Sequence, residues 1–275
     1  MVVGVVTTVL SLGVSMTAGE VLAPLRRWAL VGGLVVVNCV AVPVVAWALT
    51  SLMPLTQAQG AALILTSAGA GGAAGLKAAQ LARVANLPLA LSLVILLQVL
   101  NLASLPVWIR IALPGAEIPT GSLLAQLIGL ILLPLAVALW LRARRPSVAN
   151  AAPALVRIGN VAVGLALVTG VIGSWTEIVT VLGSWVIPCS LLIIVAGAGL
   201  GAVVAGRDSA DATTAALVSG MRFAALALVL ISRTLDNDAE HLAPALVYSL
   251  LDLGLAIAAG LWLGRRAGGR AATLG

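Results

Sequence analysis

Charge is scarce in this sequence of 275 residues: aspartate, glutamate, lysine and arginine together make up 9% of it, and 61% is hydrophobic. A soluble domain carries about 25% charged residues, so this chain lacks the groups needed to cover a water-facing surface. Apolar runs of roughly 20 residues recur, each long enough to cross about 30 Å of hydrocarbon as a helix. The alternating polarity of a membrane β-barrel is not visible. We therefore predict an all-α, polytopic membrane protein with about nine transmembrane helices.

The sequence also lacks the residues and motifs that catalysis and metal binding require. It has one histidine, His241, and no H-E-x-x-H, G-x-S-x-G or phosphate-binding glycine motif. Its two cysteines, Cys39 and Cys189, lie in separate apolar runs without C-x-x-C spacing, which favours simple packing over a disulfide or a metal site. We predict that the protein is not an enzyme and has no metal site.

The apolar runs divide the chain into nine predicted spans with short polar segments between them. The first run has no basic residues before it and no small-residue cleavage site after it, so we interpret it as a retained span and not a signal peptide. No gap is long enough to hold a soluble domain, and residues 1–275 are predicted to form one transmembrane domain. The predicted spans are residues 2–16, 28–51, 58–82, 87–111, 121–141, 154–172, 178–205, 212–231 and 242–263.

Basic residues of the predicted loops lie almost entirely on one side of the membrane. One side receives Arg110 and Arg233, and the other receives ten arginines. The positive-inside rule then predicts a cytoplasmic C-terminus, an outward N-terminus and an odd number of spans in the cell (plasma) membrane. The net charge of +6 is therefore a topology signal and does not indicate a nucleic-acid partner. The ten arginines are Arg26, Arg27, Arg83, Arg142, Arg144, Arg145, Arg207, Arg265, Arg266 and Arg270.

Two of the predicted spans are unusual and lie five apart, so they run in opposite directions. The eighth has Gly220 close to a charged residue, and the third contains Gly69, Gly71, Gly72 and Gly75. Interrupted helices in corresponding positions of two inverted halves, here residues 1–113 and 119–265, are typical of a transporter binding site at the midplane. Glycine is also common at ordinary helix contacts.

Lys77, Arg222 and Asp252 lie away from the ends of their predicted spans, where charge is costly and commonly marks a substrate or ion path. Arg222 lies near the centre of the eighth span, and its alternative is a fixed ion pair with Asp252 of the last span. Asp252 is the best candidate for protonation coupled to transport. Lys77 lies only six residues before Arg83, so it has two open interpretations: it lines a cavity, or it reaches the cytoplasmic surface.

An interrupted helix offers free backbone N–H groups, which with Lys77 and Arg222 would suit a carboxylate or sulfate. Gln98 and Asn101, one helical step apart, either line a polar cavity or bond between helices. We read Asn38 and Asn160 as simple interhelical contacts. The predicted substrate site comprises Arg222, Lys77, Gln98, Asn101, Ser219, Gly71 and Gly72, and Asp252 is the predicted coupling residue.

Three segments, in order and spacing, resemble motifs of the bile acid:sodium symporter family. Residues 13–17 (GVSMT) with Glu20 resemble its G-hydrophobic-T-L-T-x-x-D/E signature. Residues 68–75 (AGAGGAAG), followed by LAR at 81–83, resemble its first crossing helix, A-C-P-G-G-T-A-S-N. Residues 217–222 (LVSGMR), leading into AALAL at 224–228, resemble its second, E-x-G-x-Q-N-S-G-L-A-L. The resemblance implies core and panel domains, inverted repeats and alternating-access transport of an organic anion. Family members with nine spans lack the first helix.

The chain departs from the family at the sodium ligands that the resemblance implies. The family's serine-asparagine pair is Gly75 and Leu76 here, and its glutamate and glutamine are Leu217 and Met221. A lost carboxylate removes the charge that binds a cation, which argues against bound sodium. Backbone carbonyls and neutral side chains could still rebuild such a site, so sodium stays an alternative. We hypothesise that the fixed charges of Lys77 and Arg222 replace it.

The sequence thus predicts a secondary transporter of a small organic anion, coupled to protons or uncoupled, whose partners are that anion and the lipid bilayer. Related auxin-efflux and arsenite carriers are alternatives, although no cysteine stands at the glycine-rich crossing as an arsenite carrier would require. A scaffold or sensor that kept the fold without transporting is a further alternative. A transporter needs a polar path to Arg222, whereas a scaffold could bury Arg222 against Asp252. The substrate, the direction of transport and the oligomeric state are open.

Overall fold

The computed structural model describes residues 2–83, 85–114, 121, 125, 128–173, 175–223 and 239–272. All regular structure in these ranges is helical, as predicted. Many large hydrophobic side chains are exposed on the outer helices, among them Trp28, Trp140 and Trp262. Such exposure is expected where lipid, and not water, is the surrounding solvent.

The first half of the chain consists of the helices from α1 to α7. Helix α1 (Val2–Ser15) ends before α2 (Ala18–Leu22) and a 3₁₀ turn, η1 (Ala23–Arg26), where a Thr17–Glu20 capping box starts α2 in a new direction. Helix α3 (Trp28–Val36) continues through a π-helical turn, η2 (Val37–Ala41), into α4 (Val42–Leu52). Helix α5 (Gln57–Ala68) stops at the glycines, and α6 (Ala73–Ala82) follows. Helix α7 (Leu87–Ala112) completes this half.

The second half contains a π-helical turn, η3 (Ile128–Leu132), which leads into α9 (Leu133–Arg144). A 3₁₀ turn, η4 (Pro146–Ala151), connects α9 to α10 (Ala152–Gly173). Two helices, α11 (Trp175–Val181) and α12 (Val186–Ala205), are followed by α13 (Ser209–Gly220), whose first turn is capped by Asp208. Helix α15 (Ala239–Ala272) is the last and longest.

The predicted spans agree with most of these helices and need one correction. We predicted a single span over residues 178–205 and a polar break at 174–177. Helix α10 ends at Gly173 and α11 begins at Trp175, so the helix starts earlier than predicted, and a further turn follows at residues 182–185, where Gly183 has a positive φ of 86°. Glycine adopts this left-handed conformation without the steric cost that a Cβ brings. The apolar character of residues 178–205 concealed this turn.

Three helices are long and apolar enough to span a membrane, namely Trp28–Leu52, Val186–Ala205 and Leu242–Arg266. Two bent pairs, Val6–Ser15 with Ala18–Arg26 and Leu87–Asn101 with Ala103–Ala112, raise the count among the described residues to five. The protein is therefore polytopic, while the number nine stays a prediction. Most of residues 115–127 and all of 224–238, which include parts of predicted spans five and eight, lie outside the described residues.

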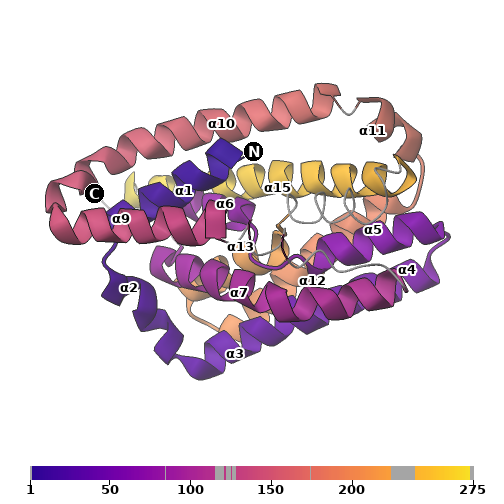
Figure 1. Ribbon diagram of the computed structural model, residues 1–275, viewed down its shortest axis with the longest axis horizontal. Coiled ribbons are helices and arrows are strands. Elements are labelled where there is room, and N and C mark those ends of the chain that lie inside the picture. Colours follow the sequence, from indigo (N-terminus) through magenta and orange to yellow (C-terminus); the bar gives the residue numbers. More distant parts are fainter. Residues whose placement is uncertain are drawn as a thin grey trace.

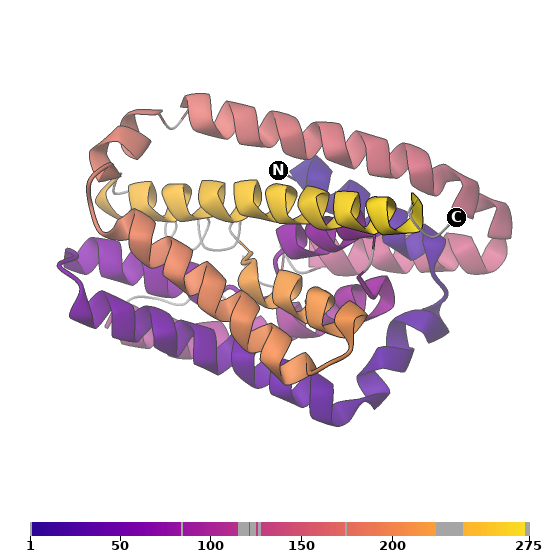
Figure 2. The same cartoon turned by 180° about the vertical axis from the view of Figure 1, so that it is seen from behind.

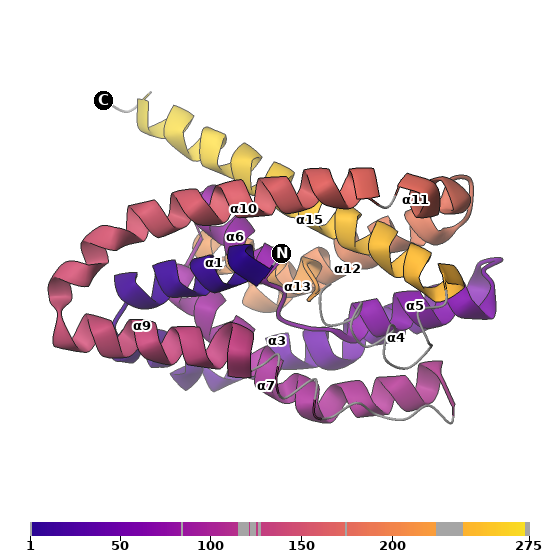
Figure 3. The ribbon, with the colours of Figure 1, turned by 45° about the horizontal axis from the view of Figure 1, so that its top comes forward.

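The helices form two groups. Helix α1 packs between α9 and α10, and Figures 1 and 3 show these three helices along one side of the molecule. We call them the three-helix layer. The remaining long helices pack into a main bundle, in which α12 contacts α13 and α15 contacts both α5 and α6. Figure 2 shows α12, α13 and α15 from behind. The inverted halves 1–113 and 119–265 stay a prediction.

Candidate functional site

Two helix breaks meet in the middle of the main bundle. Residues 69–72 separate α5 from α6, and α13 ends at Gly220 with extended backbone at Met221. The amide of Phe223 donates to the carbonyl of Gly69 at 2.8 Å, so the two breaks are joined backbone to backbone. A Cβ on Gly72 would lie 2.2 Å from the carbonyl oxygen of Arg222. Only glycine permits this approach, and the predicted interruption of the third and eighth spans is confirmed where the structure describes them.

The first break is held by two neutral amides of α7. The Asn101 side chain accepts from the Ala70 amide at 3.2 Å and donates to the Ala70 carbonyl at 2.9 Å. The Gln98 side chain donates to the Gly71 carbonyl at 2.9 Å. Both side chains are buried. They form hydrogen bonds with backbone groups at the break that have no partner within α5 or α6. Of the two interpretations left open, the structure shows the interhelical hydrogen bonds.

The second break is held by a carboxylate of α15. Both oxygens of Asp252 accept from the backbone amide of Arg222, each at 3.2 Å. This amide follows the end of α13, and Asp252 is 1% exposed. The fixed ion pair that we considered as an alternative is not formed: Asp252 binds the main chain of Arg222, and no side-chain pair within 4.0 Å joins these two described residues.

The guanidinium group of Arg222 turns toward oxygens of α13 and of the π-helical turn. Its Nη2 donates to the Ser219 carbonyl, one of the last carbonyls of α13, where the helix dipole is negative. Its Nη1 donates to the carbonyl and to Oδ1 of Asn38, both at 3.3 Å. Asn38 in turn donates from Nδ2 to the Ser219 hydroxyl at 2.8 Å. Arg222 is thus enclosed by neutral oxygens and is 1% exposed.

Two buried polar atoms next to this cluster have no hydrogen-bond partner in the described part of the chain. They are Nε of Arg222 and the hydroxyl of Tyr248, which is fully buried. Tyr248 lies four residues before Asp252 on α15, which places the two side chains on the same face of the helix. Arg222 interacts electrostatically with both of them.

Lys77, the only lysine of the chain, lies between the main bundle and the three-helix layer. Its ammonium donates to Gln80 Oε1 at 3.2 Å and approaches the Val156 carbonyl of α10 at 3.5 Å. It lines a cavity of about 210 Å³ together with Asn160 and Gly164 of α10 and Ile257 and Leu261 of α15. Lys77 is 3% exposed, so the structure favours the cavity over the cytoplasmic surface.

The structure does not bring Lys77 and Arg222 together into one anion site. Lys77 contacts α10, and a Cβ on Gly159 would lie 3.4 Å from its Nζ, whereas Arg222 contacts Asn38 and Ser219. The polar path to Arg222, by which we would distinguish a transporter from a scaffold, is not seen among the described residues, because this side chain is 1% exposed. Among the described residues no carboxylate forms an ion pair with Lys77, so the positive charge at the cavity is uncompensated.

The residues at the second break do not match the donor set of a sodium ion. The neighbouring side chains of Leu217 and Met221 are apolar and buried. The oxygens of Asn38 and Ser219, which a hard cation would prefer, already accept from the guanidinium of Arg222. A second cation in this position would face the arginine charge, and the Asp252 carboxylate is already bound to the backbone amide of Arg222.

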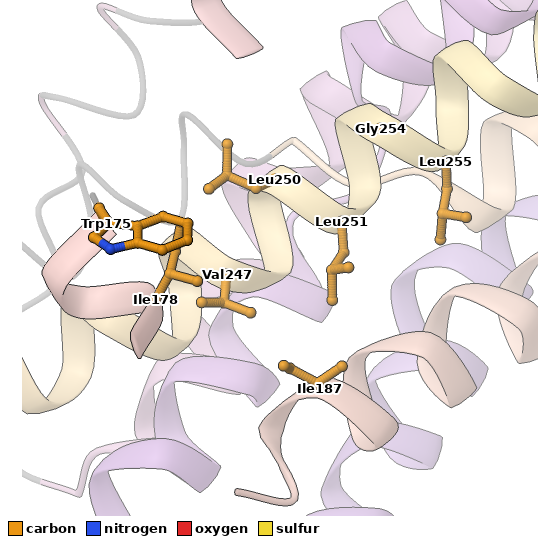
Figure 4. Close-up of a pocket in the computed structure, with 8 residues that line it drawn as sticks. All are labelled: Trp175, Ile178, Ile187, Val247, Leu250, Leu251, Gly254 and Leu255. Atoms are coloured by element: carbon orange, nitrogen blue, oxygen red, sulfur yellow. The ribbon is translucent and has the colours of Figure 1, made fainter. Parts of the chain in front are cut away.

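A larger groove of about 400 Å³ lies between α11, α12 and α15 (Figure 4). Its wall consists of Trp175, Ile178, Ile187, Val247, Leu250, Leu251, Gly254 and Leu255. No charged, hydroxyl or amide side chain of the described residues lines it. These residues offer no group that could orient an anion, and we place the candidate site at the Lys77 cavity and the two breaks.

Several site residues were missed or undervalued in the sequence. Asn38 was predicted to bond between helices, and its hydrogen bond to Ser219 confirms this; its contact with Arg222 was not foreseen, nor was the place of Asn160 in the Lys77 cavity. Gln80 donates from Nε2 to Ser11 Oγ at 3.1 Å and so links α6 to α1. Tyr248 had one available signal: it is the only tyrosine of the chain and lies one helical turn from Asp252. The cysteines were read correctly, since Cys39 and Cys189 are buried and free.

Fold and site together define a polytopic α-helical membrane protein in which two broken helices meet at their breaks. Residues 2–196, more than half of the chain, match the family model described as the Sodium Bile acid symporter family, and the chain belongs to this family. It is thus a secondary membrane transporter with a small-molecule substrate. The match includes the first break and Lys77 and ends before α13. None of the curated proteins compared with the chain matches it.

Proposed function

We propose that the protein transports a small organic anion without sodium, and that the Lys77 cavity receives the anion. The observation that carries this proposal is the buried ammonium of Lys77, which has no ion pair among the described residues and lines a cavity of about 210 Å³. A buried cation without a counter-charge attracts an anionic ligand, because desolvation leaves its field weakly screened. Asn160 offers an amide beside it for hydrogen bonding, and the apolar remainder suits a carboxylate on a hydrocarbon body.

The position of the cavity supports alternating access. Lys77 belongs to α6 of the main bundle, whereas Asn160 and Gly164 belong to α10 of the three-helix layer. Two polar contacts of the described residues join the two groups here: the amide–hydroxyl bond of Gln80 to Ser11 and the weak approach of Lys77 to Val156. A movement of one group against the other would expose the cavity first to one side of the membrane and then to the other.

Sodium independence follows from the role that we assign to Arg222. Its guanidinium supplies a permanent positive charge to the Ser219 carbonyl at the end of α13 and to the oxygens of Asn38. A covalently attached cation needs no ion gradient to remain in place. We therefore assign to Arg222 the stabilisation of the second break and to Lys77 the binding of the anion.

Uptake into proteoliposomes tests this proposal. A panel of labelled organic anions is offered with a sodium gradient, with a proton gradient or with neither. We expect uptake of at least one anion when choline replaces sodium, and an at least tenfold loss in Lys77→Leu, since a hydrogen bond to a charged group contributes about 1.5–3 kcal/mol. Lys77→Arg, which keeps the charge, is expected to retain part of the uptake.

Two further variants separate the roles of the charges. Arg222→Leu is expected to abolish uptake at all sodium concentrations, and Arg110→Leu, which removes an exposed arginine at the end of α7, is expected to leave it unchanged. Uptake that requires sodium in the wild type, or normal uptake in Arg222→Leu, would contradict the assignment. Normal uptake in Lys77→Leu would show that the transported anion does not bind in the Lys77 cavity.

A further inference from the structure

The polar end of the Lys77 cavity offers few hydrogen-bond donors. The Lys77 ammonium has three N–H groups, of which one donates to Gln80 and a second approaches the Val156 carbonyl at 3.5 Å, so one remains for a ligand. The Asn160 side chain lines the same cavity and takes part in no hydrogen bond among the described residues. One positive charge and one unengaged amide match the two oxygens of a single carboxylate.

Two threonine hydroxyls lie close to this polar end but add no donor to it. A Cβ built on Gly159 of α10 would lie 3.0 Å from Thr7 Oγ1 and 3.5 Å from Thr8 Oγ1. The same Cβ would lie 3.4 Å from Lys77 Nζ, so the three groups gather at one glycine. Both hydroxyls donate at 2.7 Å to backbone carbonyls of their own helix, α1. Only their oxygen lone pairs remain, and these repel a second carboxylate.

No second cation lines the cavity in the described part of the chain. Arg157, the only basic residue of α10, lines a separate hollow with Ile158 and Val161 on another face of that helix. Arg222 is engaged at the second break. A second negative charge on the ligand would therefore be buried without a partner, which is costly.

The rest of the cavity is apolar and limited in size. Leu81 of α6 and Ile257 and Leu261 of α15 form its wall, and Gly164 of α10 leaves space, because a Cβ there would meet nothing within 4 Å. The volume of about 210 Å³ lies between the ~150 Å³ that encloses benzene and the roughly 300–1,000 Å³ of pockets for drug-sized ligands. A ligand of about eight non-hydrogen atoms fills it.

We infer that the Lys77 cavity is a site for monocarboxylates with an apolar body of about five carbon atoms. The carboxylate accepts from Lys77 and Asn160, and the body lies against Gly164, Ile257 and Leu261. Dicarboxylates and sulfate, which carry a second charge, are disfavoured. The missing side chain of Gly164 sets the length of the body that the cavity accepts. Transport of such an acid rests on the proposed function, whereas its binding is measurable without transport.

Equilibrium dialysis of the purified protein in lipid nanodiscs, with labelled hexanoate at neutral pH, tests the selection by charge. Specific binding is the part that excess unlabelled hexanoate displaces, because partition into lipid does not saturate. Adipate has the same carbon chain with a second carboxylate. We expect adipate and sulfate to compete at least tenfold more weakly than hexanoate. Equal competition by adipate, or no displaceable binding, would overturn the inference.

The selection by size is tested at Gly164. Gly164→Leu places a side chain in the cavity while the charge of Lys77 remains. We expect the ratio of hexanoate to propionate affinity to fall at least tenfold, since hexanoate has three more methylene groups to bury. Gly164→Ala, the milder change, should lower the ratio in the same direction. Gly199→Leu on α12 is the matched control, because a Cβ there also meets nothing within 4 Å and Gly199 lies outside the cavity.

An unchanged ratio in both Gly164 variants would contradict the assigned place of the ligand body. Tighter binding of decanoate than of hexanoate would show that the body extends past Leu261, which is 44% exposed, and would overturn the size limit. Hexanoate that binds but is not taken up by proteoliposomes supports this site and counts against the proposed transport. Sodium-free uptake of another anion without displaceable hexanoate binding supports the proposed function and overturns the monocarboxylate assignment.

Discussion

The two helix breaks meet at one point, yet they are stabilised by different chemistry. Residues 69–72 are bound by the amide side chains of Gln98 and Asn101, which donate to two backbone carbonyls and accept from one backbone amide. The break after Gly220 is bound by a carboxylate on its amide and by a guanidinium on the Ser219 carbonyl. Neutral amides satisfy a fixed set of backbone groups. Charged side chains form stronger hydrogen bonds with backbone groups, but the strength of these bonds depends on the protonation state of the side chain.

We therefore expect the two breaks to respond differently to a change of pH. The first break lies beside the Lys77 helix and is predicted to keep its geometry under all conditions, because neither Gln98 nor Asn101 titrates. Asp252 is the only carboxylate at the second break among the described residues, and through it this break can respond to proton concentration. The three predictions below test this comparison at the contact of the two breaks, at the first break alone and at the second break alone.

The largest effect is expected from Gly72→Ala. Its Cβ would lie 2.2 Å from the carbonyl oxygen of Arg222, and neither backbone segment can move without breaking the Phe223–Gly69 hydrogen bond. We expect a loss of more than about 3 kcal/mol in the free energy of unfolding, measured by SDS titration in mixed micelles. Gly32→Ala, whose Cβ meets nothing within 4 Å, is the control and should be neutral. Equal stability of the two variants would refute the contact.

A smaller effect is expected from Asn101→Leu at the first break. This change leaves the amide and the carbonyl of Ala70 without their partner in a buried position, at a cost of about 2–3 kcal/mol in unfolding free energy. The loss should be the same at pH 6 and pH 8, because no titrating group is involved. Asn160→Leu, on the exposed side of α10, should leave stability unchanged. A loss that varied with pH would mean that the two breaks are not chemically independent.

The smallest effect is expected from Ser219→Ala at the second break. It removes the hydroxyl that accepts from Asn38 while the Ser219 carbonyl, which binds Arg222, remains. We expect a loss of about 1 kcal/mol, by the same titration. Ser190→Ala is the matched control, because this equally buried hydroxyl donates only to the Val186 carbonyl of its own helix. If both serines cost the same, the Asn38 contact contributes nothing to the break.

Much of the fold could be predicted from the sequence, because the bilayer imposes a simple length and polarity rule on each span. The helix Trp28–Leu52 lies within one residue of the predicted span, and α7 and α10 begin or end close to theirs. The turn at residues 182–185 was missed because no charge or proline marks it. The interruption at residues 69–72 was predictable, since four glycines in seven residues leave a helix with little side-chain packing.

The candidate site was only partly predictable. Sequence reasoning selected Arg222, Lys77 and Asp252, because a charge inside an apolar run needs a partner or a function. It could not determine which partner each would find. Asp252 binds the main chain of Arg222 and not its side chain, and Asn38, 184 residues away in the sequence, receives the guanidinium.

By itself, the sequence determined that the chain lies in a membrane as a set of helices, that two of them are interrupted, and which charges are buried. These properties depend on local composition and on the cost of exposing polar groups to lipid. Only the tertiary structure decided that the two breaks join through Phe223 and Gly69, that Lys77 faces a cavity and that Arg222 does not. The reason is physical: hydrogen bonds and cavities depend on the relative placement of helices that are distant in the chain, and no local pattern encodes that placement.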